Sequence, residues 1–130
     1  MAETYKKTIG NEGEEIAAKY IIKNNYKIIK RNYREKYGEI DIISKDSDGS
    51  LVFIEVKTMV GLDDSLKGLI PEDNFTRAKL KKMQRICQVF ANNHQKLIDE
   101  ENGWRMDLIA ILFESEKDGA PVKIRHYKNI

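Results

Sequence analysis

The sequence feature that most constrains the fold is a pair of apolar, β-branched runs joined by a short polar turn within residues 37–57. The first run covers residues 38–43 and the second covers residues 51–57, and the residues between them include the sequence Asp-Ser-Asp-Gly-Ser. Apolar runs bounded by Asp, Ser and Gly in this way are typical of a β-hairpin.

Three charged residues interrupt these apolar runs. Asp41, Glu55 and Lys57 lie inside or at the end of segments that otherwise resemble buried strands. A carboxylate is costly to bury unless it is paired with a positive charge or binds a metal ion. The fold must therefore compensate these side chains.

The length of the turn decides whether the charged residues can meet. A three-residue loop over residues 47–49, with its glycine left-handed in a G1 bulge, would place Asp41 opposite Glu55 and Glu39 opposite Lys57. A two-residue Asp-Gly loop would shift the register by one and turn the aspartate to the other face of the sheet. We expect the first register, because it gathers the charged side chains on one face.

Two carboxylates and a lysine on one face of a sheet are suited to Mg²⁺ chemistry. Mg²⁺ prefers oxygen ligands and usually keeps several waters together with phosphate oxygens of a substrate. A lysine beside such a site can stabilise the charge that develops on a phosphate. The alternative is a structural salt bridge that closes the hairpin, and the short pattern by itself favours this alternative.

Length and composition indicate one domain that spans residues 1–130. The 41% hydrophobic and 34% charged residues are typical of a soluble globular protein, and no apolar run reaches the ~20 residues that span a bilayer. The N-terminus lacks the apolar core of a signal peptide, and Cys87 has no second cysteine to pair with. We expect a cytoplasmic protein without membrane association. A net charge of +2 argues against a polycation that coats nucleic acid indiscriminately.

The spacing of apolar residues predicts a first helix over residues 11–25, preceded by a loosely held segment over residues 1–10. Asn11 is a suitable N-cap, and Glu14 then occupies the third helical position of a capping box. In the other interpretation the Glu14 carboxylate leans over the sheet toward Asp41. From the residues alone, the capping role is favoured.

A second, longer helix is predicted over residues 74–98. Cys87 and His94 lie on its apolar stripe, which favours a place in the core for both. Cations near a helix N-terminus oppose the helix dipole, so a cluster of them there suggests a phosphate backbone as partner, although a solvated face explains it equally well. This basic cluster consists of Arg77, Lys79, Lys81, Lys82 and Arg85.

The remaining strands are predicted over residues 26–34, 104–114 and 122–127. The second of these is almost continuously apolar and should be central, whereas the third alternates and should form an edge. Residues 58–73 are predicted to be a long loop that could fold over the site as a lid. The basic residues of the first strand are either a solvated edge or phosphate contacts: Lys27, Lys30, Arg31 and Arg34.

Two polar residues lie within the later strands. Asp107 interrupts the central strand, and it could pair with Arg105 or a neighbouring lysine or act as an outer-shell group near a metal. His126 belongs to the edge strand, where a surface imidazole is more common than a metal ligand. Neither residue by itself defines a function.

The order and spacing of these motifs resemble the bacterial UPF0102 family, also called YraN-like. That family is similar to the PD-(D/E)XK nuclease superfamily and to archaeal Holliday-junction resolvases. The resemblance extends from Gly10 to about Phe113. Its motifs are Gly13-Glu14, Asn32-Tyr33-Arg34, Gly38-Glu39-Ile40-Asp41, Phe53-Ile54-Glu55-Val56-Lys57, Lys79 and Asp107.

The resemblance implies a role for each of these positions. It implies that Asp41 and Glu55 are metal ligands together with the Val56 carbonyl, that Lys57 is the catalytic lysine, and that Glu14 is an acidic residue delivered by the first helix. The family usually has an arginine two residues after the lysine, where this chain has Met59. Arg77 or Lys79 could supply that phosphate contact instead.

We therefore expect an α/β domain with a mixed central sheet flanked by helices, in a restriction-endonuclease-like (PD-(D/E)XK) core. The expected function is a Mg²⁺-dependent endonuclease, also served by Mn²⁺, that cleaves DNA, with branched or irregular DNA expected by analogy. The expected contacts to nucleic acid are Arg34, Arg77, Lys79, Lys81 and Arg85. The alternatives are a non-catalytic nucleic-acid-binding protein and an adaptor that binds proteins through the long loop. Cutting a junction would require a homodimer, which the sequence does not show.

Overall fold

The computed structural model describes residues 2–61 and 76–130, with side chains from residue 8 onward. Within these residues it contains two α-helices, one short 3-10 helix and five strands. In chain order the elements are α1 (Ala2–Lys23), β1 (Lys27–Glu35), β2 (Gly38–Lys45), β3 (Leu51–Val60), α3 (Arg77–Asn93), the 3-10 helix η2 (Gln95–Leu97), β4 (Trp104–Phe113) and β5 (Val122–Tyr127).

The five strands form one mixed sheet in the order β1-β2-β3-β4-β5. Strands β3 and β4 run parallel, while the other three neighbouring pairs are antiparallel. The predicted mixed α/β architecture is confirmed, as are the central position of β4 and the edge position of β5. The β2–β3 hairpin lies near the middle of the sheet, as expected.

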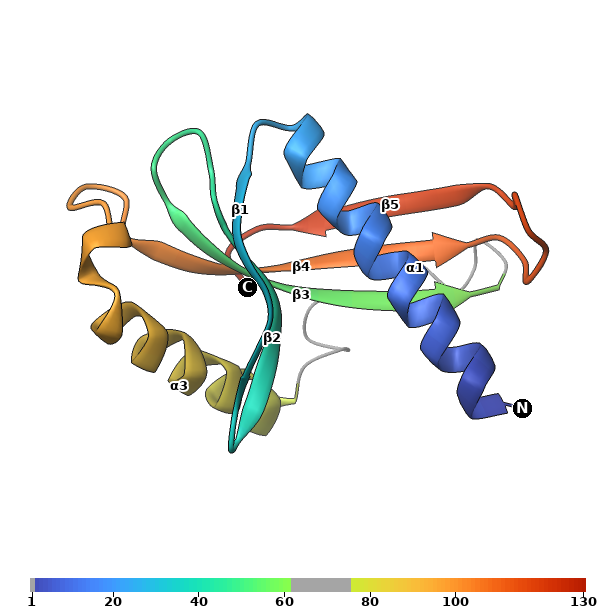
Figure 1. Cartoon of the computed structure of the whole chain (residues 1–130), viewed down its shortest axis with the longest axis horizontal. Coiled ribbons are helices and arrows are strands. Elements are labelled where there is room, and N and C mark those ends of the chain that lie inside the picture. Colours follow the sequence, from blue (N-terminus) through green and yellow to red (C-terminus); the bar gives the residue numbers. More distant parts are fainter. Residues whose placement is uncertain (1, 62–75) are drawn as a thin grey trace.

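The two helices cover opposite faces of this sheet (Figure 1). Ala17 and Ile21 of α1 pack with Ile42, Ile54 and Ile109 in one apolar cluster. A second cluster on the other face joins α3 to the same strands through Met83, Ile86, Cys87, Phe90, Ile40, Ile43, Leu51, Phe53 and Leu108. Burial of apolar surface on both faces explains why these central strands are almost wholly apolar.

The β2–β3 turn has the predicted three-residue loop. The Asp46 N–H donates to the Ser50 carbonyl oxygen over 2.9 Å, and the Gly49 N–H donates to the Asp46 carbonyl oxygen over 3.0 Å. Gly49 has a φ of +94°, the left-handed conformation that glycine adopts without strain. Lys45 pairs with Leu51 and Ile42 with Ile54, so the predicted register is confirmed.

Strands β2 and β3 diverge beyond the Ile42–Ile54 pair. Strand β2 continues along β1 as far as Gly38, and β3 continues along β4 as far as Val60. Ile42 packs in the cluster beneath α1, whereas Ile40 packs in the cluster beneath α3. Residues two apart in a strand normally share a face, so β2 turns over between these two isoleucines, at Asp41. The expected Glu39–Lys57 pair is therefore wrong, since the ladder ends first.

Helix α1 begins at Ala2, far upstream of the predicted start. Asn11 lies inside the helix and cannot be its N-cap, so the capping box assigned to Glu14 is wrong. Residues 2–10 belong to the helix, whereas the sequence predicted that they precede it. The sequence misleads here because Gly10, Asn11 and Gly13 all disfavour helix interiors. No helix among the described residues is long and apolar enough to cross a membrane.

Helix α3 is shorter than predicted. Its N-cap is Thr76, whose hydroxyl accepts a hydrogen bond from the Lys79 N–H over 3.1 Å, and its last residue is Asn93. Cys87 is fully buried, as expected, but His94 follows the helix and is exposed, with its ring stacked on Phe90 at 4.0 Å between centroids. The placement of His94 in the core is wrong because the helix ends before the stripe reaches it.

The predicted loop over residues 58–73 is partly a strand. Residues 58–60 continue β3 beside β4, where Thr58 pairs with Ile111 and Val60 with Phe113. This part of the prediction is wrong because the parallel ladder with β4 outlasts the ladder with β2. Residues 62–73 of the predicted loop, and with them the predicted lid, lie outside the described residues.

Candidate functional site

A cleft of about 610 Å³ lies where β2 and β3 separate beneath α1. It brings together Glu14 of α1, Asp41 of β2, and Glu55, Val56 and Lys57 of β3. These are the predicted catalytic and metal-binding residues. The other residues that line the cleft are Ile9, Gly10, Thr58 and Val60.

Asp41 occupies the wedge that the diverging strands leave open. Its side chain is only 6% exposed, and its Oδ2 accepts a hydrogen bond from the Val56 N–H over 2.7 Å. The alternation of backbone groups along β3 turns the Val56 N–H toward β2, where a β2 carbonyl would have accepted it had the ladder continued. The aspartate replaces that missing partner. The Val56 carbonyl oxygen lies on the same edge of β3 and thus faces the wedge.

The environment of the two strand carboxylates favours their protonated forms. Burial raises the pKa of Asp41, and the nearby Glu14 carboxyl raises it further, while the hydrogen bond from Val56 opposes both effects. Burial also raises the pKa of Glu55, and the charges of Asp41, Glu39 and Glu14 add to this effect more than Lys57 counteracts it. When its carboxyls ionise, the site carries more negative charge than Lys57 balances, and a bound cation would favour the ionised forms.

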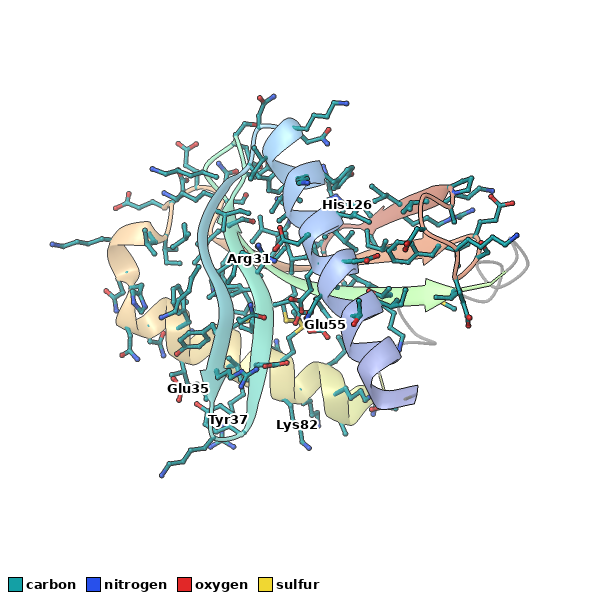
Figure 2. All side chains as sticks on the ribbon, turned by 45° about the vertical axis from the view of Figure 1, so that its right-hand side comes forward. Arg31, Glu35, Tyr37, Glu55, Lys82 and His126 are labelled. Atoms are coloured by element: carbon teal, nitrogen blue, oxygen red, sulfur yellow. The ribbon has the colours of Figure 1, made fainter. Side chains whose placement is uncertain are left out.

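Close packing of α1 on β3 places Glu14 in this cleft. A Cβ added to Gly13 would overlap the Thr58 Oγ1, so the helix backbone rests directly on the strand at this point. Glu14 follows Gly13 and reaches Asp41, where it contributes to the raised pKa through its charge and a hydrogen bond. In Figure 2, Glu55 lies beside α1, in the middle of the molecule.

The donor set of the cleft fits one kind of metal ion better than others. Within the part of the chain that the structure describes, no three His, Cys, Asp or Glu side chains form a group able to hold a metal ion by themselves. A closed zinc or calcium site needs more protein ligands than Asp41 and Glu55 provide. Mg²⁺ is commonly held by one or two carboxylates, with waters and substrate phosphates completing its octahedron. The cleft residues fit that arrangement.

The structure does not bring the predicted nucleic-acid contacts into the cleft. The basic residues of α3 are all exposed, and α3 packs on the face of the sheet opposite α1. Arg34 is exposed on the edge strand β1, and its Nε forms an ion pair with Glu39 Oε2 at 3.0 Å. None of these cations lines the cleft within the described residues.

Asp107 belongs to a separate buried network. Its carboxylate accepts hydrogen bonds from Arg105 Nε at 3.0 Å and from the Asn129 N–H at 3.0 Å, and it lies 2.7 Å from His126 Nε2. Burial alone would raise the pKa of Asp107, but these hydrogen bonds and the arginine charge hold it below its ordinary value. The predicted pairing with Arg105 is confirmed. The cleft-lining residues do not include Asp107.

The same network corrects the prediction for His126. Its side chain is only 7% exposed, and its Nδ1 lies 3.2 Å from the Tyr20 hydroxyl. The surface imidazole was predicted because β5 is an edge strand, but α1 covers this part of it. Arg105 extends the network through Nη2 to the Tyr26 hydroxyl and to Asp46 Oδ2, each at 3.0 Å. The sequence indicated only the pair of Asp107 with Arg105 and not the rest of this network.

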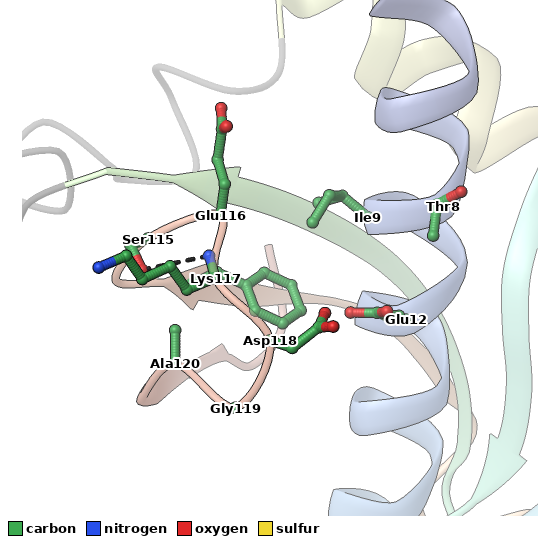
Figure 3. Close-up of a pocket in the computed structure, with 10 residues that line it drawn as sticks. Thr8, Ile9, Glu12, Ser115, Glu116, Lys117, Asp118, Gly119 and Ala120 are labelled. Atoms are coloured by element: carbon green, nitrogen blue, oxygen red, sulfur yellow. Dashed lines mark hydrogen bonds between the residues drawn. The ribbon is translucent and has the colours of Figure 1, made fainter. Parts of the chain in front are cut away.

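A smaller pocket of about 260 Å³ lies at the far end of the sheet, between α1 and the β4–β5 turn. It was not predicted from the sequence. Figure 3 shows the Glu12 and Asp118 carboxylates pointing toward one another in this pocket. The pocket shares Ile9 with the cleft but none of the predicted site residues.

Sheet order, helix placement and the carboxylate-lined cleft together define a small mixed α/β protein with an acidic site at a strand divergence. Residues 13–111 match the family described as "Uncharacterised protein family UPF0102", and the chain belongs to this family. Family membership, expected from the sequence motifs, is thus confirmed.

Individual relatives match along almost the whole chain. A UPF0102 protein of Desulforamulus reducens is 37% identical over 124 residues, which cover 95% of each chain. A UPF0102 protein of Clostridium botulinum is 38% identical over 118 residues, or 91% of this chain and 90% of the relative. The matched region of the family includes Glu14, Asp41, Glu55 and Lys57.

Proposed function

We propose that this protein is a Mg²⁺-dependent endonuclease that hydrolyses phosphodiester bonds in DNA and has a restriction-endonuclease-like (PD-(D/E)XK) core. The observation that carries the proposal is the meeting of Glu14, Asp41, Glu55 and Lys57 in one cleft, although they come from three different elements. Buried carboxylates with raised pKa values and a neighbouring lysine are a common mark of catalytic sites.

Each cleft residue has a role in this proposal. Asp41, Glu55 and the Val56 carbonyl would hold Mg²⁺, which when bound polarises a phosphate and lowers the pKa of a coordinated water. Lys57 supplies positive charge to the phosphate oxygens as the water oxygen attacks phosphorus and the bond to the leaving sugar oxygen breaks. Glu14 adds a third carboxylate near Asp41. The leaving oxygen takes up a proton, and the new phosphate end carries the added hydroxyl oxygen.

The choice of a phosphodiester substrate rests on charge. The cleft itself is acidic and would repel a phosphate without a cation, whereas α3 presents five cations and no acidic residue. These cations can bind the backbone outside the cleft without reading bases. The preference for branched or irregular DNA, and the dimer that junction cutting would require, rest on the family resemblance alone.

The separation of α3 from the cleft favours one competing function, a nucleic-acid-binding protein without catalysis. A basic face that lies apart from the carboxylates could bind a phosphate backbone whether or not the cleft holds a metal ion. The two functions differ in their need for Mg²⁺ and Asp41.

The decisive experiment compares wild type with Asp41→Asn on linear, single-stranded, flapped and four-way DNA, with Mg²⁺ or Mn²⁺. We expect wild type to cut at least one substrate and Asp41→Asn to cut it at least ~100-fold more slowly. Glu12→Gln is the matched control, because it also removes a carboxylate, but one of α1 that lines the other pocket; it should cut normally.

Two results would count against the nuclease. Cleavage that is equal in wild type and Asp41→Asn would show a contaminating activity. Salt-sensitive DNA binding without cleavage, together with a melting temperature unchanged by Mg²⁺, would favour the non-catalytic alternative.

A further inference from the structure

The tip of the β1–β2 hairpin presents an aromatic side chain to solvent. Glu35 pairs with Gly38, which leaves Lys36 and Tyr37 at the turn. Tyr37 is 36% exposed. Within the described part of the chain, only two other large hydrophobic side chains, Ile22 and Ile124, are as exposed.

The tip is docked on α3. Gly38 has a φ of +151°, and a Cβ added there would lie 2.8 Å from the Ile86 Cδ1, so the hairpin backbone rests directly on the helix. The Arg85 guanidinium lies over the Tyr37 ring, 5.0 Å from its centroid. Figure 2 shows Tyr37 and Lys82 at the same end of the molecule. Hairpin tip and helix therefore form one continuous surface.

This surface is strongly basic. Every residue of α3 from Arg77 to Asn93 is neutral or cationic, and its cations are all exposed. Lys36 adds a further exposed cation at the hairpin tip, where Glu35 accepts a hydrogen bond from the Tyr33 hydroxyl and Glu39 is paired with Arg34. The cations of the surface are Lys36, Arg77, Lys79, Lys81, Lys82 and Arg85. A row of cations beside an exposed aromatic ring is the arrangement that single-stranded nucleic acids bind, through phosphates and stacked bases respectively.

We propose that Tyr37 stacks on an unpaired base of a nucleic acid whose backbone lies along the basic face of α3. The proposal deepens the proposed function and rests on it insofar as nucleic acid is the substrate; it adds a substrate class, a strand with unpaired bases. The bases of a continuous duplex are already stacked on one another and cannot use the ring. Arg85 holds the ring in place and adds a cation–π contact.

The test measures binding by fluorescence anisotropy in EDTA, so cleavage plays no part. The probes are a single strand of about 12 nucleotides, an abasic strand of the same length and a duplex. Tyr37→Ala should bind the single strand about 10-fold more weakly and leave the affinity for the other two unchanged. Tyr37→Phe should bind as wild type, because it keeps the aromatic face.

Two controls separate stacking from charge and from loss of exposed apolar surface. Lys82→Ala should weaken binding to all three probes and reduce the slope of log affinity against log salt by about 0.7–0.9. Ile22→Ala, which removes an exposed apolar side chain on α1, should change none of them.

Equal weakening of all three probes by Tyr37→Ala, or no change in any of them, would overturn the proposal. Absence of binding to every probe would overturn it too. The nuclease proposal is tested separately, because it requires that Asp41→Asn lose Mg²⁺-dependent cleavage. If wild type cuts DNA but Tyr37→Ala binds every probe normally, only the stacking proposal is refuted.

Discussion

Asp41 and Glu55 are the first residues beyond the β2–β3 ladder, and this position explains their chemistry. The ladder buries the strands around them, while its end leaves these two residues without backbone pairing between β2 and β3. The Val56 N–H donates a hydrogen bond to one Asp41 oxygen. Among the charges that act on the pKa of Glu55, only that of Lys57 lowers it. The ionised carboxylates of the site repel one another, and a bound cation would relieve this repulsion.

The pH dependence of stability tests whether folding raises the pKa values of Asp41 and Glu55. A carboxyl whose pKa is raised by folding binds its proton more tightly in the folded state, so its stabilising contribution is present at low pH and is lost as pH rises through the raised pKa. Without divalent cations, the melting temperature of wild type should therefore fall between about pH 5 and about pH 8.

Asp41→Asn should flatten this fall and stabilise the protein at about pH 8 by roughly 1 kcal/mol. Melting followed by circular dichroism measures both effects. Glu100→Gln changes an exposed carboxylate and should keep the wild-type profile. A wild-type melting temperature that rises over this range would contradict the prediction.

For Asp107, in the buried network, the same Asp→Asn substitution is expected to destabilise the protein rather than stabilise it. Asp107→Asn leaves the Arg105 charge with weaker compensation in a buried site, which should cost about 3–5 kcal/mol of unfolding free energy. Urea denaturation measures this loss. Asp118→Asn, on the exposed β4–β5 turn, should change stability by less than about 0.5 kcal/mol. A small effect of Asp107→Asn would show that the network is not needed for the fold.

At the scale of elements, the position of α1 decides whether Glu14 reaches the site. Gly→Ala within a helix normally stabilises it by about 0.5–1 kcal/mol. Gly10→Ala should do so, because an added Cβ meets no atom within 4 Å. Gly13→Ala should instead destabilise the protein, because the added Cβ overlaps Thr58.

A double variant identifies the cause. Thr58→Ala should restore most of the stability of Gly13→Ala, because it removes the overlapping hydroxyl. Unfolding free energies of the two single variants and the double variant measure the coupling. Stabilisation of the protein by Gly13→Ala alone would show that α1 and β3 are not in close contact.

The sequence predicted the register of the β2–β3 hairpin more accurately than it predicted the bounds of the helices. The loop over residues 47–49 requires one left-handed glycine, and this requirement set the register of β2 and β3. The start of α1 was missed because Gly10 and Asn11 disfavour a helix interior, whereas Gly13, within the predicted helix, is needed for close packing on β3. Such a tertiary contact overrides propensity and leaves no local signal.

At the scale of the whole molecule, the acidic cleft and the basic face of α3 lie on opposite sides of the sheet. The carboxylates line the cleft beneath α1, whereas the cations of α3 lie on the opposite face of the sheet. The strand residues of the cleft followed from the hairpin register. For Glu14, the residues alone favoured a capping role, and the family resemblance was needed to favour a place beside Asp41. The Asp107 network joins β4 to α1, to β5 and to the β2–β3 turn, so its full extent follows only from the complete topology.

Mg²⁺ should stabilise the folded protein through this acidic surface. At a concentration about ten times the dissociation constant, binding to the folded state alone contributes roughly 1.4 kcal/mol. The rise in melting temperature should be larger at about pH 8 than at about pH 5, since protons compete for Asp41 and Glu55. Asp41→Asn should remove most of the rise. An equal rise in wild type and variant would place the bound ion elsewhere.

The short β2–β3 ladder also has a mechanical consequence. Within the described residues, β1 and β2 are joined to the rest of the sheet only through the four residue pairs of β2 and β3 from Ile42–Ile54 to Lys45–Leu51. Asp41 lies just beyond these pairs, on the part of β2 that leads to Tyr37. Glu55 lies just beyond them on β3, which stays paired with β4. The gap between the two acids therefore depends on where the hairpin tip packs against α3.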